Sequence, residues 1–113
     1  MSPITTHILD TASGRPASNV PVILEIEKDG DFEQIGQGLT DEDGRVKDLL
    51  VDNHDLLAGI YRISFNTEKY YQDINKETFY PEANIVFKVI ATDEHYHVPL
   101  LLSGFGYSTY RGS

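Results

Sequence analysis

Apolar and polar residues alternate with a period of two along several short stretches of this chain, and that pattern most constrains its fold. Successive side chains of a strand point to opposite faces, so the alternation predicts strands with one buried face. The clearest stretches are 20–27, 61–66 and 85–92. Glycine-containing turn signals separate the strands, and they are Ser13-Gly14-Arg15-Pro16, Asp29-Gly30-Asp31, Asp43-Gly44 and Ala58-Gly59. Short strands separated in this way predict an all-β sandwich or barrel of antiparallel sheets.

Local signals add a hairpin and a helix to this pattern. An Asp-Gly pair at 29–30 predicts a tight hairpin that joins residues 20–28 to residues 32–38. The alternation breaks at Thr67–Lys76, where two apolar residues are four apart, as on one face of a helix. We expect a short surface helix there, with Thr67 as its cap. Residues 49–57 fit neither pattern and are expected to form a loop.

Bulk properties limit the classes of protein to consider. The 113 residues predict a single domain, 1–113, and the net charge of −9 disfavours nucleic acids and anionic membranes as partners. The chain has no cysteine, so it can have no disulfide and no thiolate zinc site. The longest fully apolar run, 98–102, is too short to span a bilayer, and the first ten residues do not resemble a signal peptide. We therefore expect a soluble, cytoplasmic protein.

Histidines are the side chains most suited to chemistry. His95 and His97 share one face of a predicted strand, and the residues of its opposite face are apolar or aromatic. That opposite face should be the core face, which leaves His97 on the outer surface of its sheet. Near the start, Ile4 and Ile8 form a plausible inward pair that turns His7 outward. Neighbouring strands could therefore bring His7 and His97 together.

Other interpretations of these residues stay open at this point. An outward histidine on a strand is most often only solvated, and His54 in its acidic loop belongs in that class. An H-x-H pair is also a common zinc fragment, but spacing fixes no third ligand here. The acidic run 41–44 is a turn rather than a calcium loop, because leucines occupy the first and last ligand positions. The residues alone thus predict a sandwich with a candidate imidazole cluster, and no more.

Several segments resemble the sequence motifs of the 5-hydroxyisourate hydrolases, the transthyretin-related enzymes of urate breakdown. The segments are His95–Ser103, Tyr107–Ser113, Thr6–Asp10, Gly14–Ala17, Val20–Val22, Thr40, Asp43–Val46 and Phe79–Glu82. The ending Tyr-Arg-Gly-Ser is specific, because thyroid-hormone carriers of the same fold lack it. One departure is Gly104, which stands where the family usually has proline and should loosen the turn before the last strand.

This resemblance implies a fold and an assembly. The fold is a transthyretin-like sandwich of two antiparallel four-stranded sheets with one short helix. The assembly is a homotetramer, a dimer of dimers, with active sites in the channel between dimers. In a tetramer, an outward histidine lines a pocket, because a second sheet covers it. The reaction implied is the opening of the cyclic amide of 5-hydroxyisourate by water, which gives 2-oxo-4-hydroxy-4-carboxy-5-ureidoimidazoline, with no metal or organic cofactor.

The resemblance also implies which residues do the chemistry. The family's active-site positions correspond to His7, Arg45, His97, Tyr110, Arg111, Gly112 and Ser113. An imidazole is a natural proton acceptor near neutral pH, so His97, or alternatively His7, is expected to be the general base that activates water. Arg45 is expected to hold the substrate carbonyls and to stabilise the oxyanion. Tyr110 is expected to donate to a ring heteroatom, and Arg111 and Ser113 to position the substrate.

Two other functions compete with the hydrolase. The first is a non-catalytic carrier of small aromatic ligands, which would use the same central channel. His7, Arg45, His97 and the Tyr-Arg-Gly-Ser ending favour the enzyme, because a channel for an apolar hormone would have aliphatic or hydroxyl groups at those points. The second is an isolated adhesion or receptor module, which would require an exposed recognition loop.

Overall fold

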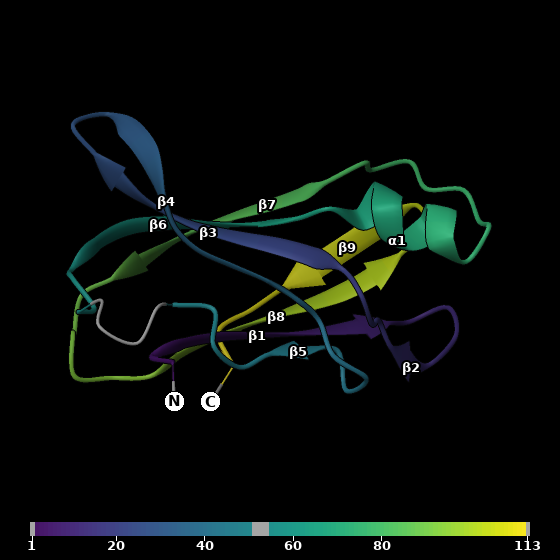
Figure 1. Cartoon of the computed structure of the whole chain (residues 1–113), viewed down its shortest axis with the longest axis horizontal. Coiled ribbons are helices and arrows are strands. Elements are labelled where there is room, and N and C mark those ends of the chain that lie inside the picture. Colours follow the sequence, from purple (N-terminus) through teal and green to yellow (C-terminus); the bar gives the residue numbers. More distant parts are fainter. Residues whose placement is uncertain (1, 51–54, 113) are drawn as a thin grey trace.

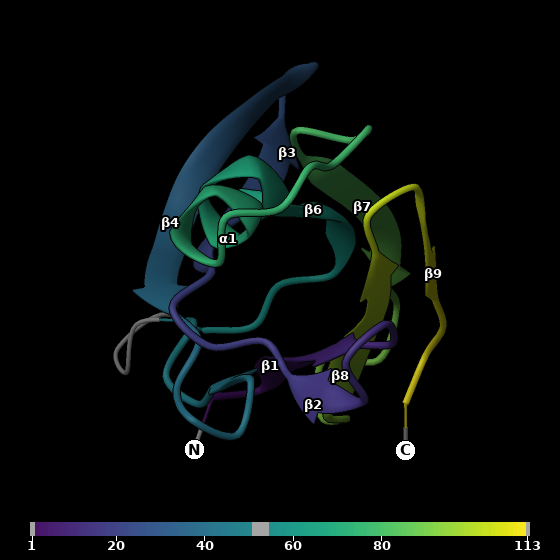
Figure 2. The same ribbon diagram turned by 90° about the vertical axis from the view of Figure 1, so that its right-hand side faces the viewer.

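Two facing β-sheets with a helix at one end make up the computed structural model, which describes residues 2–50 and 55–112 (Figure 1). The first sheet has the order β2-β1-β8-β9, with β5 also paired to β1. Its strands are β1 (Ile4–Asp10), β2 (Arg15–Pro16), β5 (Arg45–Val46), β8 (Tyr96–Ser103) and β9 (Gly106–Thr109). The second sheet has the order β4-β3-β6-β7, from β3 (Pro21–Lys28), β4 (Asp31–Leu39), β6 (Gly59–Phe65) and β7 (Ala83–Val89). Seen end on, the second sheet curves over the first (Figure 2).

The alternation in the sequence becomes the core between the two sheets. In β1, every second residue is buried, starting with Ile4, and the residues between them are half-buried on the outer face. In β8, Tyr96, Val98, Leu100 and Leu102 are buried in the same core, as the sequence predicts. The outer face of the first sheet therefore carries the odd-numbered residues of β1 and β8, including both predicted site histidines.

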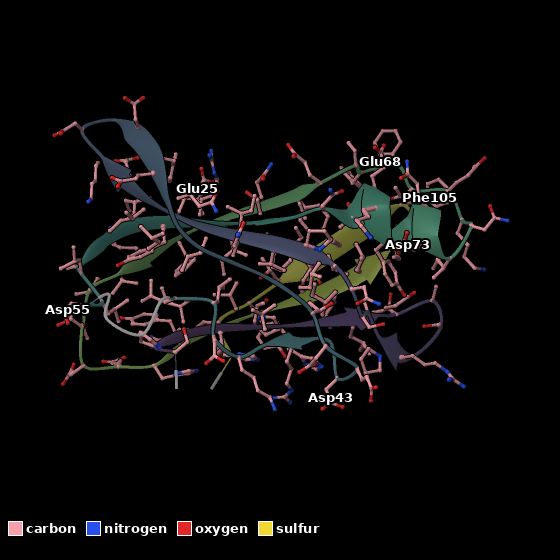
Figure 3. The ribbon with its side chains drawn as sticks, viewed as in Figure 1. Glu25, Asp43, Asp55, Glu68, Asp73 and Phe105 are labelled. Atoms are coloured by element: carbon pink, nitrogen blue, oxygen red, sulfur yellow. The ribbon has the colours of Figure 1, made fainter. Side chains whose placement is uncertain are left out.

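The hairpin between β3 and β4 is confirmed. Its two turn residues, Asp29 and Gly30, have positive φ angles of 54° and 86°, which suit the type I′ turn of a two-residue hairpin. The second sheet then continues from β3 to β6, where the Nε of Arg62 donates to the carboxylate of Glu25 over 2.8 Å. Figure 3 labels Glu25, which lies on the second sheet, whereas the predicted site histidines lie on the first.

The first sheet differs from the expectation of four antiparallel strands. Among the described residues it has five strands, and β1 and β8 lie parallel, with Thr5 opposite His97 and Ile8 opposite Leu100. Between β1 and β8 the chain passes through the whole second sheet, so no hairpin fixes their relative direction. Residue alternation identifies the buried face of a strand but not the direction of its partner. The two-sheet sandwich itself is confirmed.

Helix α1 (Thr67–Asp73) lies where the alternation breaks, but its cap and its end differ from the prediction. Asn66, not Thr67, is the N-cap, since its side chain accepts from the backbone N–H of Lys69. The Thr67 hydroxyl is buried and donates instead to the carbonyl oxygen of Tyr80 over 2.6 Å. Asn and Thr are both good caps, so the sequence alone could not choose between neighbouring candidates.

Residues 49–50 and 55–57 have no helix or strand, which agrees with the predicted loop. Leu49 and Leu50 are nevertheless fully buried in the core. The prediction for His54 lies outside the described residues, as does that for Ser113. Within the part of the chain that the structure describes, no helix is long and apolar enough to cross a membrane.

Candidate functional site

Strands β5, β1 and β8 bring three of the predicted site residues to one outer face. His7 of β1 is paired with Arg45 of β5 on one side and with Pro99 of β8 on the other. His97 is paired with Thr5, two residues before His7, so both imidazoles lie on the same face. Both histidines are half-buried, and Arg45 is exposed. The sheet therefore places an imidazole pair beside a guanidinium group.

Arg45 owes its position to the acidic turn before β5, whose Asp43 is labelled in Figure 3. One carboxylate oxygen of Asp41 accepts from the backbone N–H groups of Asp43 and Arg45, over 2.9 and 3.0 Å. The hydrogen bond from Arg45 is the main cause of a lowered Asp41 pKa. Gly44, with φ of 74°, closes the turn, and its carbonyl oxygen accepts from the backbone of Ile8 in β1. These contacts make the segment a turn, as predicted, and attach Arg45 to β1.

His97 sits in a network that includes a second histidine. Its Nδ1 lies 2.8 Å from the hydroxyl oxygen of Thr5, and the same oxygen lies 2.9 Å from Nε2 of His95. Burial lowers the pKa of His97, and the nearby Arg45, His7 and His95 lower it further. The neutral imidazole, which can accept a proton, is therefore the favoured form of His97 near neutral pH.

A surface hollow of about 520 Å³ opens beside His97. A second hollow of about 410 Å³ adjoins His7. Arg45 and Lys47 line both, so each histidine adjoins a hollow that carries the same two cations. The residues that line the first hollow are Thr5, Thr6, Arg45, Val46, Lys47, Asp48, His95 and His97. Such a surface can attract an anion to a neutral imidazole, although the whole chain carries a charge of −9.

Tyr110 and Arg111 lie elsewhere within one chain. The guanidinium of Arg111 is 4.3 Å from the ring centre of Tyr96, which points into the core, away from the face of His97. Arg111 also donates to the carboxylate of Glu94 over 2.9 Å, across an exposed pair. Tyr110 is 58% exposed and lines a different hollow together with Arg111. The structure therefore divides the predicted set into two groups that line different hollows, with the Arg111 guanidinium on the core side.

Gly112 belongs to the first group. Its backbone N–H donates to the carbonyl oxygen of His97 over 2.8 Å, so the chain after β9 runs beside the predicted base. A Cβ atom at this position would lie 2.6 Å from Cδ2 of the imidazole, closer than real Cβ contacts allow. Only glycine lets the backbone approach His97 this closely.

Three residues near His97 received no catalytic role from the sequence. Thr5 follows the period-two rule with His7, so its place beside His7 could have been found from spacing. For His95 the sequence indicates only a candidate zinc fragment with His97. Lys47 lies just beyond the two-residue strand β5, and no sequence signal pointed to it. Across residues 2–50 and 55–112, no three histidine, cysteine or acidic side chains are grouped as metal ligands.

Comparison with known proteins adds relatives to this geometry. The model of the HIUase/Transthyretin family matches residues 4–112. A 5-hydroxyisourate hydrolase of Salmonella typhimurium is 47% identical over 110 residues, which cover 97% of this chain and 80% of the relative. A 5-hydroxyisourate hydrolase of Mus musculus is 40% identical, with 99% of this chain and 96% of the relative covered.

Solved structures of both a carrier and an enzyme resemble the chain. Sea bream transthyretin in complex with thyroxine has a TM-score of 0.91 and 33% identity, with 98% of this chain and 95% of that chain covered. Klebsiella pneumoniae 5-hydroxyisourate hydrolase has a TM-score of 0.84 and 33% identity, with 97% and 98% covered. The fold alone therefore does not separate carrier from enzyme, and the side chains of the site must.

Proposed function

Because the chain belongs to the HIUase/Transthyretin family, we propose that it hydrolyses 5-hydroxyisourate in urate breakdown. The product is 2-oxo-4-hydroxy-4-carboxy-5-ureidoimidazoline. The observation that carries the proposal is the grouping of His7, Arg45 and His97 on one face of the first sheet. The curated relatives at 36% to 47% identity, which bear the hydrolase name, support it.

The chemistry requires one proton acceptor and one cation. Water attacks the carbonyl carbon of the cyclic amide while His97 accepts a proton from it, and Arg45 donates hydrogen bonds to the oxyanion that forms. The carbon–nitrogen bond then breaks, and the ring nitrogen takes the proton from the imidazolium. His7, which is paired directly with Arg45, is the alternative base. The lowered pKa of His97, caused first by burial, supports His97 in this role.

The remaining site residues require a second subunit in this proposal. Within one chain the Arg111 guanidinium lies on the core side and Tyr110 lines a different hollow from His97, so an assembly has to bring them to a substrate. We propose a homotetramer, a dimer of dimers, in which the outer faces of first sheets oppose each other and Tyr110, Arg111, Gly112 and Ser113 help to bind substrate. Residues 1–113 act as one domain in the cytoplasm, without a cofactor, nucleic acid or membrane as partner.

A direct assay tests the activity. Urate and urate oxidase generate 5-hydroxyisourate in place, and its absorbance decay is followed with and without the protein. Acceleration over the spontaneous decay is expected. His97→Ala should lose about 10²- to 10⁴-fold in kcat, the usual contribution of a general base, while the assembly persists in size-exclusion chromatography. A rate equal to the spontaneous decay would refute the hydrolase function. A fully active His97→Ala would show that another group is the base.

The alternative is a carrier of small aromatic ligands, which the match to thyroxine-bound sea bream transthyretin favours. Calorimetric titration of a small aromatic hormone separates the two functions. The hydrolase requires turnover and predicts weak hormone binding, because charged Arg45 and Lys47 line the hollows. Tight binding without turnover would establish the carrier.

A further inference from the structure

The hydroxyl of Thr5 lies between the rings of His95 and His97. Among the described contacts of these rings, it is the only group that reaches both. Its oxygen lies 2.9 Å from His95 Nε2 and 2.8 Å from His97 Nδ1. A hydroxyl donates one hydrogen bond and accepts others, so it cannot donate to both rings at once. We propose that Thr5 couples the two tautomers, so that a neutral His95 keeps His97 ready to act as base. This inference rests on the proposed hydrolase function.

The productive arrangement follows from hydrogen-bond polarity. His97 carries its proton on Nδ1 and donates it to the Thr5 oxygen, and the Thr5 hydroxyl donates to an unprotonated Nε2 of His95. Nε2 of His97 then holds the lone pair, and within the described residues it has no hydrogen-bond partner. That nitrogen accepts the proton from water. Thr5 and His95 are positioning residues, since they act through His97.

Protonation of His95 reverses the direction of both hydrogen bonds. A doubly protonated His95 can only donate through Nε2, so the Thr5 oxygen becomes its acceptor and the Thr5 hydroxyl, no longer held by His95, is free to donate to Nδ1 of His97. With the hydroxyl donating to Nδ1, a neutral His97 carries its proton on Nε2, and no lone pair is left there to accept the proton of water. One proton on His95 therefore inactivates the base without a charge on His97 itself.

The charged neighbours make a second, electrostatic coupling that must be separated from this one. Arg45 of β5, His7 of β1, and Lys47 and Asp48 in the same hollow all surround the pair. The backbone carbonyl of His95 accepts from Arg111, which is itself paired with Glu94. Removal of the Thr5 hydroxyl changes none of these charges. A valine in place of Thr5 keeps the shape and the β-branching, and serine restores the hydroxyl.

The experiment follows ¹⁵N chemical shifts of the histidine rings against pH in the wild-type protein, Thr5→Val and Thr5→Ser. In the wild type and in Thr5→Ser, His97 should hold its proton on Nδ1 near neutral pH and move it to Nε2 as His95 protonates. In Thr5→Val, the tautomer of His97 should not respond to His95. A wild-type His97 with its proton on Nε2 near neutral pH, or an unchanged response in Thr5→Val, would overturn the coupling.

The acid limb of kcat/KM against pH provides the matching kinetic readout. Two protons that each stop catalysis give a limiting slope of about 2 on a logarithmic plot, and one proton gives about 1. The wild type and Thr5→Ser should approach the steeper slope, and Thr5→Val the shallower one with a lower kcat. Equal slopes in an active enzyme would contradict the coupling alone. An inactive wild type would refute the hydrolase function, while the ring shifts would still decide the coupling.

Discussion

His97 combines two demands on one side chain. In the proposed mechanism it has to stay neutral to accept a proton, and it has to lie beside cations that hold an anionic substrate. A position on the outer face of β8, near Arg45, satisfies both, because partial burial and the positive neighbours lower its pKa. In the proposed mechanism, the guanidinium that supports the oxyanion therefore also favours the neutral form of the base.

Arg45→Gln should raise the pKa of His97, because it removes one positive charge and leaves the burial of the ring. As the pH falls, the imidazole then becomes protonated at a higher pH than in the wild type, so the acid limb of kcat/KM shifts to higher pH. The overall rate also falls, because the guanidinium is lost. The C–H proton shifts of the ring give the same titration without turnover. Arg15→Gln, on exposed β2 and not among the causes of the shift, is the control. A lower or unchanged His97 pKa in Arg45→Gln would contradict this electrostatic account.

Gly112→Ala tests whether the chain after β9 positions the base. The new Cβ would lie 2.6 Å from Cδ2 of His97, so the ring has to move. A shift of about 1 Å at a reacting group costs on the order of 10²-fold, so a large loss of kcat is expected in the 5-hydroxyisourate assay. Gly106→Ala, whose Cβ would meet its nearest atom at 3.9 Å, is the matched control. An unchanged kcat in Gly112→Ala would show that the position of the base does not depend on Gly112.

At the scale of elements, sequence alternation predicted faces well and partners poorly. It placed His7 and His97 outward, because burial of Ile4, Ile8 and Val98 leaves no other face. It did not reveal that β1 and β8 lie parallel, since a strand's pattern is the same in either direction. Capping chemistry likewise located helix α1 but could not choose Asn66 over its neighbour. Each miss concerns a contact with a segment distant in sequence or a choice between equivalent groups.

Helix α1 is attached to β1 by one buried hydrogen bond, from the hydroxyl of Tyr70 to the carboxylate of Asp10 over 2.7 Å. The adjacent Tyr71 hydroxyl is buried and has no partner among the described residues. Tyr70→Phe should lower the free energy of unfolding by about 1–3 kcal/mol, because it leaves a buried carboxylate oxygen unpaired. Tyr71→Phe removes an unpaired hydroxyl and should change that energy by less than about 0.5 kcal/mol, or raise it.

Urea denaturation of the three proteins measures this pair. The two substitutions delete the same atom from neighbouring residues of one helix, so they differ only in whether the hydroxyl has a partner. Equal losses would show that the Asp10 contact adds nothing to stability. A larger loss for Tyr71→Phe would mean that its hydroxyl finds a partner in solution.

At the scale of the whole molecule, the site depends on what covers the outer face of the first sheet. The motif resemblance grouped Tyr110 and Arg111 with His97, but one chain places the Arg111 guanidinium on the core side, against Tyr96. Resemblance transfers which residues matter and not which subunit supplies each one. Spacing separates Arg111 from Gly112, because successive residues of a strand point to opposite faces, but it does not show which subunit completes the site.

Leu101→Glu tests the assembly. Leu101 is half-buried on the outer face of β8, opposite Leu9, on the same side as His97. In a free chain the new carboxylate faces water, but in the proposed tetramer it would be covered and unpaired, which costs several kcal/mol. We expect smaller species in sedimentation velocity and a kcat/KM that falls with dilution far more steeply than in the wild type.

Ile23→Glu is the control for Leu101→Glu, because it adds the same charge to an apolar side chain that is 37% exposed on the outer face of the second sheet. It should leave the sedimentation profile and the rate unchanged, since that face takes no part in the proposed channel. Leu101→Glu could instead sediment as a single chain and still turn over at the wild-type rate. A single subunit would then contain the complete site, and Tyr110 and Arg111 of a neighbouring chain would not take part in the reaction.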